Sequence, residues 1–582
     1  MDSPPAFLDV TRSYGARRWT GPAPETERLG AAIAQATGQP EIVGRILARL
    51  GVAPGEAAGF LAPSLRELMP DPSRLRDMDR ASERLLAAVR REERIAIFAD
   101  YDVDGGASAA LLLTWLRALG RTATLYVPDR IEEGYGPNVP AMRSLGAGHD
   151  LIVCVDCGTL SHEPIAAAGC DVIVLDHHLG GETLPPALAV VNPNRQDEDG
   201  ALGHLCAAGV TFLFLVAVNR LMRREGGEGP DLLGLLDLVA LATVADVAPL
   251  LGLNRAFVRQ GLTVMRARGR PGIAALAAAA GMAGAPDAFA LGFLLGPRIN
   301  AGGRIGAADL GARLLATDDP DEAAALAQKL DRLNAERREI EAGVLAAAEA
   351  QAEARGGAAL VWAAGEGWHP GVVGIVAARL KEKFSRPAVV IGFDGADGKG
   401  SGRSVAGADL GAAVARLARE GLIARGGGHR MAAGISLARE SLEPAMTRLA
   451  ELLAAAGADS STTASLALDG VIGPGGATVE LAERIAAAGP FGAGAPAPRL
   501  AMARSRIVRT RRVGENHLAL TLADEAGARA EAIAFRAFAG ELGPRLLARR
   551  DAPVHVAGRL ERDEWAGRLR AKLHVEDAAD AS

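Results

Sequence analysis

The chain has 582 residues, which is long for one hydrophobic core and predicts three or four domains. Hydrophobic residues make up 49% of it and charged residues 23%, a composition that is typical of globular proteins. Its 71 glycines and 31 prolines, about 18% of the chain, lie below the range that is typical of low-complexity disorder. The formal net charge of −6 excludes a basic signature over the whole chain, so any binding of nucleic acid must rest on local patches.

The cysteines are too few and too clustered for a disulfide framework. They are Cys154, Cys157, Cys170 and Cys206. Residues 1–19 contain no continuous apolar segment that would be typical of a secretory signal, so we expect a reduced, cytoplasmic compartment. Two apolar stretches are predicted to be buried helices, because 205–218 is too short to span a bilayer and 232–253 contains Asp237 and Asp246.

Residues 1–90 predict loop and short helices, for example 41–50 and 80–91. From residue 94 onwards, short apolar runs alternate with helical stretches such as 107–119 and 161–168. The apolar runs are 94–99, 123–127, 151–155, 172–175 and 187–191. This alternation predicts a parallel α/β sheet that is buried on both faces.

Residues 201–315 look mainly helical, and 319–355 predict one long helix that ends at Gly356. The near-heptad spacing of its apolar residues fits a connector between two lobes better than a free coiled coil.

A second α/β pattern follows, with strands expected at 358–362 and 388–393 and helices at 372–383 and 410–419. From about residue 463 the chain becomes rich in alternating segments that predict a small barrel. These segments are 500–508, 517–522, 530–534, 554–559 and 568–575.

Acidic and imidazole side chains follow three of the expected strands. They are Asp100, Asp102, Asp104, Asp156, Asp176, His177 and His178. Because the carboxyl ends of parallel strands meet at one edge of a sheet, we expect these groups to converge there. Asp104 taken alone is equally well explained as a helix cap. The whole set of like charges needs a cation to hold it together.

A fourth element contributes Asp246, which interrupts an otherwise apolar helix, where an unpaired carboxylate is costly. Carboxylates with imidazoles and without thiolates favour Mn²⁺ or Mg²⁺ over structural zinc. Cys154 and Cys157 have CxxC spacing, but there is no second pair, and we expect them to pack in the core.

Four of these segments, in this order, resemble the motifs of the DHH phosphoesterase superfamily. They are DYDVDG (100–105), VDCG (155–158), DHH (176–178) and TVADV (243–247). Five further motifs narrow the resemblance to the RecJ family of bacterial single-stranded-DNA-specific 5′→3′ exonucleases. They are GPRINAGGR (296–304), GWHPGVVG (367–374), GSGRS (400–404), GGGH (426–429) and PFGAG (490–494). The resemblance extends from about residue 16 to beyond residue 500.

The resemblance implies an α/β fold in which a parallel-sheet DHH catalytic domain is joined by a long helix to a smaller α/β domain, DHHA1. A C-terminal OB-type β-barrel follows. The expected boundaries are 1–60 for an N-terminal helical and loop segment, 61–318 for DHH, 319–357 for the connecting helix, 358–462 for DHHA1 and 463–582 for the OB domain.

The same resemblance implies two ions of Mn²⁺, or Mg²⁺ in its place. Asp100 and Asp156 would bind one ion; Asp102, Asp156, His177 and Asp246 would bind the other. His178 would lie beside the metals and the scissile phosphate. Phe98 stands where some relatives carry a histidine that ligates the first metal, which leaves that position to water.

The glycine-rich motifs supply the residues expected to bind substrate. Arg298 and Arg304 would neutralise the scissile or an adjacent phosphate, and Asn300 would support their loop; the alternative is a surface turn with solvated arginines.

Ser401, Arg403 and His429 are expected on two flexible loops whose backbone amides form nests for an anion. By the resemblance they form the pocket for the 5′-terminal phosphate of the strand. The alternative is a pair of structural glycine turns.

A basic run without acids lies on the first strand of the expected barrel. It consists of Arg499, Arg504, Arg506, Arg509, Arg511 and Arg512. An OB barrel commonly binds single strands through a basic groove. Because aromatic residues are sparse there (Phe535, Phe538 and Trp565), we expect a mainly electrostatic contact.

The resemblance implies a metal-dependent exodeoxyribonuclease that releases mononucleotides by two-metal-ion hydrolysis and acts in DNA repair and recombination. The expected partners are single-stranded DNA, a single-strand-binding protein and a repair helicase, and the chain is expected to be a monomer. One alternative is a phosphodiesterase for short oligonucleotides or cyclic dinucleotides, or a pyrophosphatase, of the same superfamily. Those relatives are compact two-lobe proteins. A second alternative is a non-catalytic replication scaffold, but the presence of all the metal-binding groups disfavours it.

Overall fold

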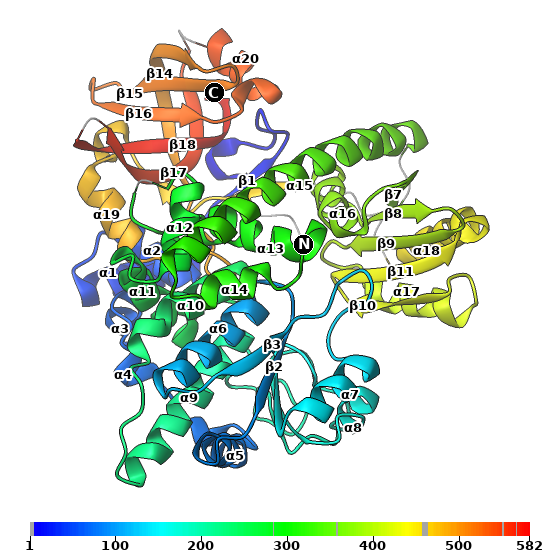
Figure 1. Cartoon of the computed structure of the whole chain (residues 1–582). Helices are drawn as coiled ribbons and strands as arrows, with labels where there is room; N and C mark the ends of the chain where they lie inside the picture. Colours follow the sequence, from blue (N-terminus) through cyan, green and yellow to red (C-terminus); the bar gives the residue numbers. More distant parts are fainter. Residues whose placement is uncertain are drawn as a thin grey trace. The chain divides into compact units, whose positions relative to one another are not determined.

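The structure is a computed structural model that describes residues 5–282, 284–356, 359–456, 464–549, 552–565 and 567–581. The chain divides into two compact units (Figure 1). One unit consists of Pro72–Asp246 and Val264–Ser461, and the other of Met1–Asp71, Val247–Thr263 and Thr462–Ser582.

The first sheet has five parallel strands in the order β3-β2-β4-β5-β6. Their bounds are β2 (Ile95–Ala99), β3 (Ala123–Tyr126), β4 (Leu151–Val155), β5 (Asp171–Leu175) and β6 (Ala189–Val191). Every residue of β2, β4 and β6 is buried, because helices cover both faces. The predicted parallel α/β sheet is confirmed.

Helices α7 and α8 pack on the face of the sheet that carries Phe98 and Cys154 (Figure 1). Helices α5, α6 and α9 contact the strands from the other side. The bounds of these helices are α5 (Met78–Arg90), α6 (Val103–Ala118), α7 (Val139–Gly148), α8 (His162–Ala166) and α9 (Ala207–Arg224).

The next part of the chain is helical, as predicted. Its elements are α10 (Leu236–Ala245), α11 (Gly252–Arg266), α12 (Pro271–Ala279), the π-helix η4 (Ala290–Leu295), α13 (Gly296–Ile305) and α14 (Leu310–Ala316). The predicted connecting helix is confirmed as α15 (Pro320–Arg355). Asp319 caps its N-terminus by accepting hydrogen bonds from two backbone amides. No helix among the described residues has the length and apolarity needed to cross a membrane.

The expectation of a loop around Arg298 and Arg304 is wrong, because 296–305 form helix α13. Glycine disfavours helices, so the segment resembles a turn when only its sequence is considered. In the fold its glycines allow close packing: a Cβ on Gly303 would lie 2.9 Å from the carbonyl oxygen of Tyr101.

The second sheet has the strand order β10-β11-β9-β8-β7 and is mixed. Its strands are β7 (Val361–Glu366), β8 (Ala388–Asp394), β9 (Asp397–Arg403), β10 (Arg425–His429) and β11 (Ala432–Ala438). The associated helices are α16 (Pro370–Phe384), α17 (Leu410–Arg419) and α18 (Leu442–Ala455). The strand expected at 358–362 begins at Val361, and position 358 lies outside the described residues.

The two glycine-rich segments expected here as flexible loops with amide nests are strands, so that expectation is wrong. Residues 400–403 belong to β9 and 426–429 to β10, and their backbone groups form the sheet ladder. Because glycine is depleted in strands, these segments could not be recognised as strands from their sequence. In the structure the absence of a Cβ allows close packing, because a Cβ on Gly402 would lie 2.7 Å from Leu410 Cδ2.

The other unit contains a closed five-stranded barrel, because β14 pairs with both β15 and β17 in addition to the chain of pairs β15-β16-β18-β17. Its strands are β14 (Leu500–Val513), β15 (His517–Ala523), β16 (Arg529–Ala534), β17 (Val554–Trp565) and β18 (Arg568–Asp580). All five predicted strands are present, and the OB-type barrel is confirmed.

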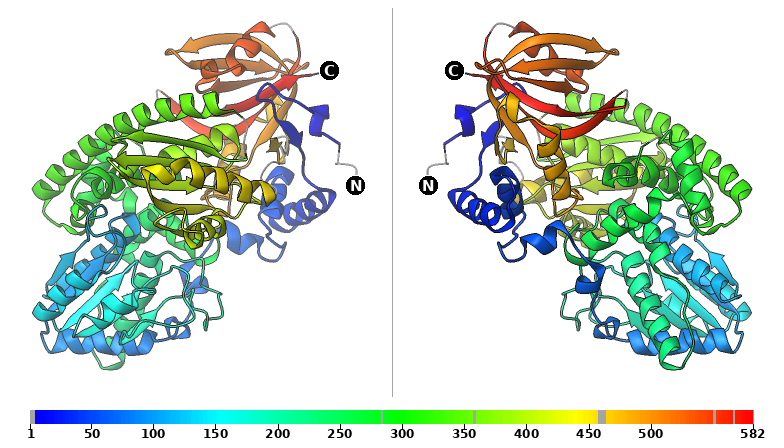
Figure 2. Two further views of the ribbon diagram at one scale, coloured as in Figure 1. Left: turned by 90° about the vertical axis from the view of Figure 1, so that its right-hand side faces the viewer. Right: turned by 90° about the vertical axis from the view of Figure 1, so that its left-hand side faces the viewer.

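The N-terminal segment shares a core with this barrel. Strand β1 (Arg18–Thr20) pairs in parallel with β12 (Ser465–Ala467), and Ile46 and Leu47 pack in the same cluster as Leu500. The smaller elements of this unit are α1 (Pro24–Thr37), α2 (Glu41–Arg49), α3 (Ala57–Leu61), α4 (Leu65–Leu68), β13 (Gly470–Val471), α19 (Val479–Ala487) and α20 (Leu542–Ala548). Figure 2 shows the N-terminal segment in blue and the barrel in orange and red from two sides. The sequence pattern alone did not predict this pairing.

Candidate metal centre

Polar residues follow four neighbouring strands of the first sheet at the same level. Ala99, Val155, Leu175 and Val191 lie opposite one another in register. The residues that come next are Asp100, Asp156, Asp176 and Asn192. Sheet register therefore brings three acids and an amide together at the carboxyl edge, as the sequence predicted for the acids.

Asp156 adopts a left-handed backbone conformation with φ of 60°, which is uncommon for a residue other than glycine. The Tyr135 hydroxyl donates a hydrogen bond to the Asp156 carbonyl oxygen at 2.9 Å and lies 3.1 Å from Nδ1 of His178. Tyr135 thus supports both the turn that carries Asp156 and the neighbouring imidazole.

Asp176 positions the two histidines that follow it. Its Oδ1 accepts hydrogen bonds from the backbone N–H groups of His177 and His178 and lies 2.8 Å from Nδ1 of His178. Burial lowers the pKa of His178, but the hydrogen bond and charge of Asp176 outweigh burial and raise it to about 9. The side-chain amides of Asn192 and Asn194 donate to the carbonyl oxygens of His178 and His177, which fixes this turn further.

Asp102 and Asp104 both cap helices, but α6 is capped by Asp102 and not by Asp104. Asp102 caps α6 by accepting hydrogen bonds from the amides of Asp104 and Gly105. Asp104 is fully buried and accepts from the amides of Ala207 and Ala208 at the start of α9, at 2.7 and 2.8 Å. Asp104 is therefore a cap, although of a distant helix.

The carboxylates and imidazoles fall into three sets whose ligand atoms all lie within 4.8 Å of one another. These sets are Asp100/Asp102/Asp156, Asp104/His177/Asp246 and Asp156/His177/His178. All the predicted ligands meet here, with Nε2 of His177 at 3.3 Å from Asp156 Oδ1 and 3.8 Å from Asp246 Oδ2. Asp104 also lies here, at 3.7 Å from His177, as expected for the whole set, although the sequence did not name it among the metal ligands.

The electrostatics of this cluster fit bound cations. Oδ1 of Asp100 and Oδ1 of Asp156 are buried and have no hydrogen-bond partner among the described residues. Burial, together with the neighbouring carboxylates, raises the pKa of Asp100, Asp104 and Asp156 and brings that of Asp246 to about 8. A divalent cation would satisfy these oxygens and keep them ionised.

The cysteines take no part in this cluster, as expected. Cys154 and Cys157 are buried among apolar side chains, and burial raises the pKa of both thiols. Phe98 lies in the same apolar cluster and stacks on Tyr126 with ring centroids 5.3 Å apart.

Helix α13 packs against the acidic turn and carries three of the residues expected to bind substrate, Arg298, Asn300 and Arg304. Oδ1 of Asn300 accepts a hydrogen bond from the Val103 amide at 3.0 Å, so Asn300 supports the acidic turn itself. Arg298 donates to Asp331 Oδ1 at 2.8 Å and to a carbonyl oxygen one turn earlier in the chain. An ion pair therefore holds its guanidinium in one orientation.

Arg304 donates to the carbonyl oxygen of Gly371 at the start of α16, at 2.9 Å. Burial and the charges of Arg130 and Arg337 lower its pKa to about 10. Arg130 lies over the ring of Tyr101 at 5.1 Å and lines, with Arg304 and His369, a hollow of about 160 Å³. Cations thus gather beside the carboxylates, where a phosphate would need them.

Ser401 and Arg403 lie on β9 and face α16. Nη1 of Arg403 donates to the Ser401 hydroxyl at 2.8 Å, and a Cβ on Gly374 of α16 would lie 3.2 Å from Nη2 of Arg403. Burial, together with the charge of Arg130, lowers the pKa of Arg403. His429 belongs to the same row of the sheet as Arg403, since both pair through Ala432.

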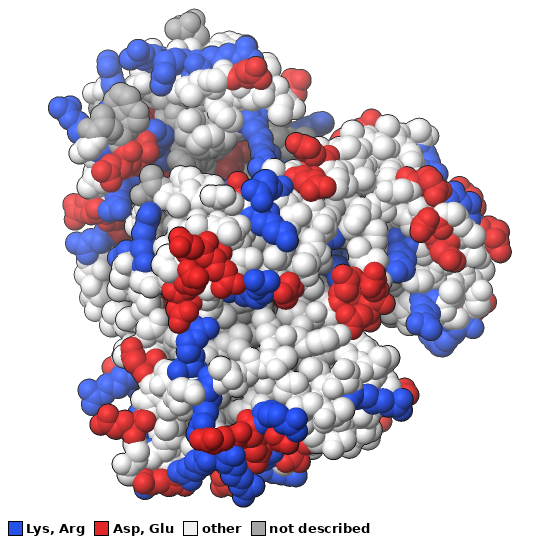
Figure 3. Space-filling model, viewed as in Figure 1, with Lys and Arg blue, Asp and Glu red and all other residues white. Residues whose placement is uncertain are grey.

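The basic run of the barrel is only partly free. Arg499 pairs with Glu576, and the guanidinium of Arg512 lies 4.2 Å from the ring centroid of Phe538. Arg506, Arg509 and Arg511 are exposed on β14 and make no ion pair with any described residue. Lys and Arg side chains gather over the barrel at the top of Figure 3.

The aromatic residues of the barrel differ in their surroundings. Phe535 is 53% exposed and flanked by the rings of His517 and His574, each at 5.3 Å, and so offers one face for stacking. The side chain of Trp565 lies outside the described residues.

Sequence reasoning missed Arg130, Tyr135, Asn192 and Asn194; it placed Asp176 in the acidic cluster but did not predict that Asp176 positions the two histidines. Arg130 and Tyr135 follow β3, and Asn192 follows β6. The rule that ligand-binding residues follow the carboxyl ends of parallel strands would have indicated them as well.

Three family models match the chain. The DHH family N-terminal domain matches residues 94–243, the DHHA1 domain matches 356–455, and the RecJ OB domain matches 468–577.

Proteins described as single-stranded-DNA-specific exonuclease RecJ match along most of the chain. The protein from Escherichia coli is 39% identical over 82% of this chain and 86% of its own length. That from Thermus thermophilus is 36% identical over 86% of this chain and 71% of its own length. The crystal structure of Thermus thermophilus RecJ in complex with Mn²⁺ matches with a TM-score of 0.78 and 32% identity, covering 95% of this chain and 78% of that one. A structure described as exonuclease RecJ bound to manganese matches with a TM-score of 0.57 and 38% identity, covering 65% of this chain and 95% of the other.

Proposed function

The chain belongs to the RecJ family of single-stranded-DNA-specific exonucleases, and we propose that it shortens such strands from the 5′ end, releasing mononucleotides by two-metal-ion hydrolysis. The observation that carries this proposal is that Asp100, Asp156 and His177 at the sheet edge meet Asp246 at the end of α10, and that the buried Oδ1 atoms of Asp100 and Asp156 have no hydrogen-bond partner among the described residues.

The residues fit Mn²⁺ or Mg²⁺, and the proposed ligands are Asp100, Asp102, Asp156, His177 and Asp246, with Asp104 now a further candidate. When bound, a pair of such ions supplies a hydroxide nucleophile near neutral pH and stabilises the charge on the oxygens around phosphorus.

The protein itself orients the groups. Asp176 holds His178 beside the cluster, where Nε2 can donate a hydrogen bond to a phosphate oxygen. Arg298, positioned by Asp331 and assisted by Arg304 and Asn300, neutralises the scissile or adjacent phosphate. Ser401, Arg403 and His429 take the 5′-terminal phosphate, which sets the direction of degradation.

The test is digestion of oligonucleotides labelled at the 5′ or the 3′ end, with added Mn²⁺, Mg²⁺ or chelator. Labelled mononucleotide should appear at once from 5′-labelled DNA, whereas 3′-labelled DNA should shorten in steps. Chelator should stop both reactions and added Mn²⁺ restore them. Immediate release of the 3′ label would contradict the proposed polarity.

We propose further that the enzyme acts as a monomer in the cytoplasm, in DNA repair and recombination, together with a single-strand-binding protein and a repair helicase. The barrel's exposed arginines and Phe535 support contact with a strand longer than a dinucleotide. Comparing dinucleotide with long DNA as substrate would distinguish this function from that of a dinucleotide phosphodiesterase.

A further inference from the structure

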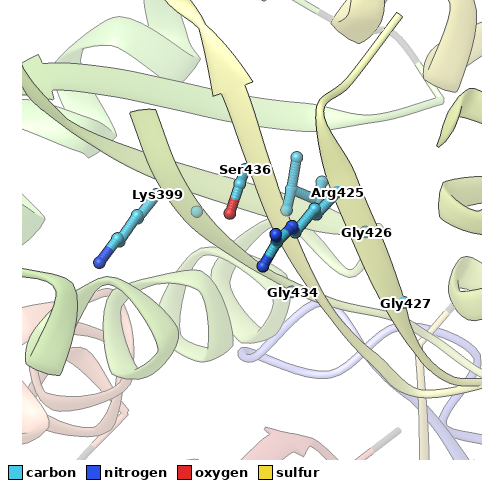
Figure 4. Close-up of a pocket in the computed structure, with 8 residues that line it drawn as sticks. Lys399, Arg425, Gly426, Gly427, Gly434 and Ser436 are labelled. Atoms are coloured by element: carbon cyan, nitrogen blue, oxygen red, sulfur yellow. The ribbon is translucent and has the colours of Figure 1, made fainter. Parts of the chain in front are cut away.

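The second sheet carries a trough of about 430 Å³ that none of the residues assigned above lines. Figure 4 shows it between Lys399, Ser436 and Arg425, which come from β9, β11 and β10. These three residues lie opposite one another in register. Directly opposed residues project from the same face of a sheet, so two cations and a hydroxyl line one row.

This row is continuous with the proposed terminal-phosphate pocket. The next row consists of Ser401, Gly434 and Gly427, and the one after that contains Arg403 and His429. Ser401 and Arg403 lie against Gly374 of α16, at 3.1 and 3.2 Å from where its Cβ would be, and the start of that helix accepts a hydrogen bond from Arg304 of α13. The Lys399 row follows on the other side of Ser401, so we place it at the end of the trough away from the metal centre. A strand whose end reached past Ser401 would meet Lys399 and Arg425 next.

The floor of the trough is open because it is made of glycine. A Cβ on Gly427 or Gly434 would have no atom within 4 Å. The side chains of Lys399 and Arg425 form no ion pair or hydrogen bond with the described part of the chain. Beyond them on the same face stands Asp397, whose charge disfavours a further phosphate.

The dimensions suit a nucleotide rather than a lone phosphate. The volume lies within the range of about 300–1,000 Å³ that is typical of small-molecule pockets. The Lys399 and Ser401 rows are two residues apart along the strand, or about 6.7 Å. This separation suits neighbouring phosphates of an extended strand.

We propose that the trough is an outer nucleotide subsite, an inference that rests on the proposed 5′ exonuclease function. It holds the first nucleotide of a strand that has moved inward by one residue, with its 5′-phosphate among Lys399, Ser436 and Arg425. The first internucleotide phosphate then occupies the pocket of Ser401, Arg403 and His429, and the second linkage lies at the metal centre.

Hydrolysis in this register releases a dinucleotide. The oxygen of water bonds to phosphorus, and the bond from phosphorus to the 3′ oxygen breaks. That oxygen leaves with a proton on the dinucleotide, and the shortened strand keeps a 5′-phosphate for the next cycle.

The experiment uses a 5′-phosphorylated oligonucleotide whose first linkage is a charged, non-hydrolysable methylenephosphonate, beside the same oligonucleotide with natural linkages. The wild type should shorten the blocked DNA, with the blocked dinucleotide as the first product. The double variant Lys399→Ala/Arg425→Ala should do so about tenfold more slowly, because charge-assisted hydrogen bonds are lost. It should degrade the natural DNA at the wild-type rate. The matched control is Lys329→Ala/Arg419→Ala, which removes two exposed cations from α15 and α17.

Three results would overturn the subsite. The first is that the wild type degrades natural DNA but leaves blocked DNA intact. The second is that the double variant shortens blocked DNA as fast as the wild type does. The third is that the double variant is slowed equally on both substrates. If the wild type degrades neither DNA, the proposed exonuclease function fails, and the subsite fails with it.

Discussion

Asp102 caps a helix and is also a proposed metal ligand. It caps α6 through two backbone amides, and its carboxylate stands with those of Asp100 and Asp156. The same position of the carboxylate suits both the cap and the proposed ligand role, because the helix N-terminus stabilises the negative charge that a cation also needs. The two tasks can be separated, since asparagine caps helices as well as aspartate does but carries no charge.

We expect Asp102→Ala and Asp102→Asn both to lower the cleavage rate by on the order of a hundredfold or more, since either change removes a charged ligand. Only Asp102→Ala should also lower the free energy of unfolding, by about 1 kcal/mol, because it removes the cap. Single-turnover cleavage, DNA binding by fluorescence anisotropy and denaturant unfolding measure the three quantities. DNA binding should be retained in both variants. Wild-type turnover in Asp102→Asn would refute the proposed ligand role.

Arg403 is expected to read the phosphate at the end of the strand. Arg403→Ala should slow degradation of 5′-phosphorylated DNA by about tenfold, because a charge-assisted hydrogen bond is lost, and leave 5′-hydroxyl DNA almost unaffected. The ratio of kcat/KM on the two substrates measures this preference. An equal loss on both would show that Arg403 has a general role. Arg419→Ala, an exposed arginine on α17, serves as control.

Among the elements, α13 shows how glycines can build a site inside a helix. Gly303 lies against the backbone of Tyr101, in the turn that carries Asp100 and Asp102. Glycine lowers the stability of a helix, but here it allows the helix to approach the acidic turn closely.

We expect Gly303→Ala to displace the acidic turn, because its Cβ would lie 2.9 Å from the Tyr101 carbonyl oxygen and 3.0 Å from the Tyr101 Cβ. Cleavage should fall and the Mn²⁺ concentration for half-maximal activity should rise. Gly343→Ala in α15 is the matched control, since its Cβ would meet nothing within 4 Å. It should add about 0.5–1 kcal/mol to the free energy of unfolding with activity unchanged. Equal behaviour of the two variants would refute the packing argument.

The elements that the sequence predicted well are those with strong local patterns. The buried strands β2, β4 and β5 and the long helix α15 are confirmed within a few residues. The barrel strands are confirmed too, although β14, β17 and β18 extend five or six residues beyond their predicted ends. Three elements that it did not predict, α13, β9 and β10, are rich in glycine, whose local preference is for turns. There, packing against neighbouring elements overrides local propensity.

For the molecule as a whole, the distribution of charge matters more than its sum. The net charge is −6, yet Arg506, Arg509 and Arg511 lie exposed on β14 of the barrel. Such a local field can attract a nucleic-acid backbone in spite of an acidic total.

We expect binding of long single-stranded DNA to weaken steeply with salt, because arginines release counterions from the strand. Replacing Arg506, Arg509 and Arg511 with alanine should reduce the slope of log K against log salt by about 2, because each phosphate that an arginine neutralises on a single strand contributes about 0.7. The control is Arg143, Arg223 and Arg224→Ala, which removes the same charge from exposed positions on α7 and α9. An unchanged slope in the barrel variant would refute its role in binding.

Local pattern alone was enough to place a set of acids and a histidine at the ends of buried parallel strands, because apolar runs and the residues that follow them can be recognised from the order of residues in the chain. Long-range packing decided what stands around them. Asp104 caps a helix that begins about a hundred residues later, Tyr135 supports the Asp156 turn, and the N-terminal segment shares a core with the barrel. Such contacts join residues far apart in the chain, and burial and hydrogen bonding select them only when the whole fold forms.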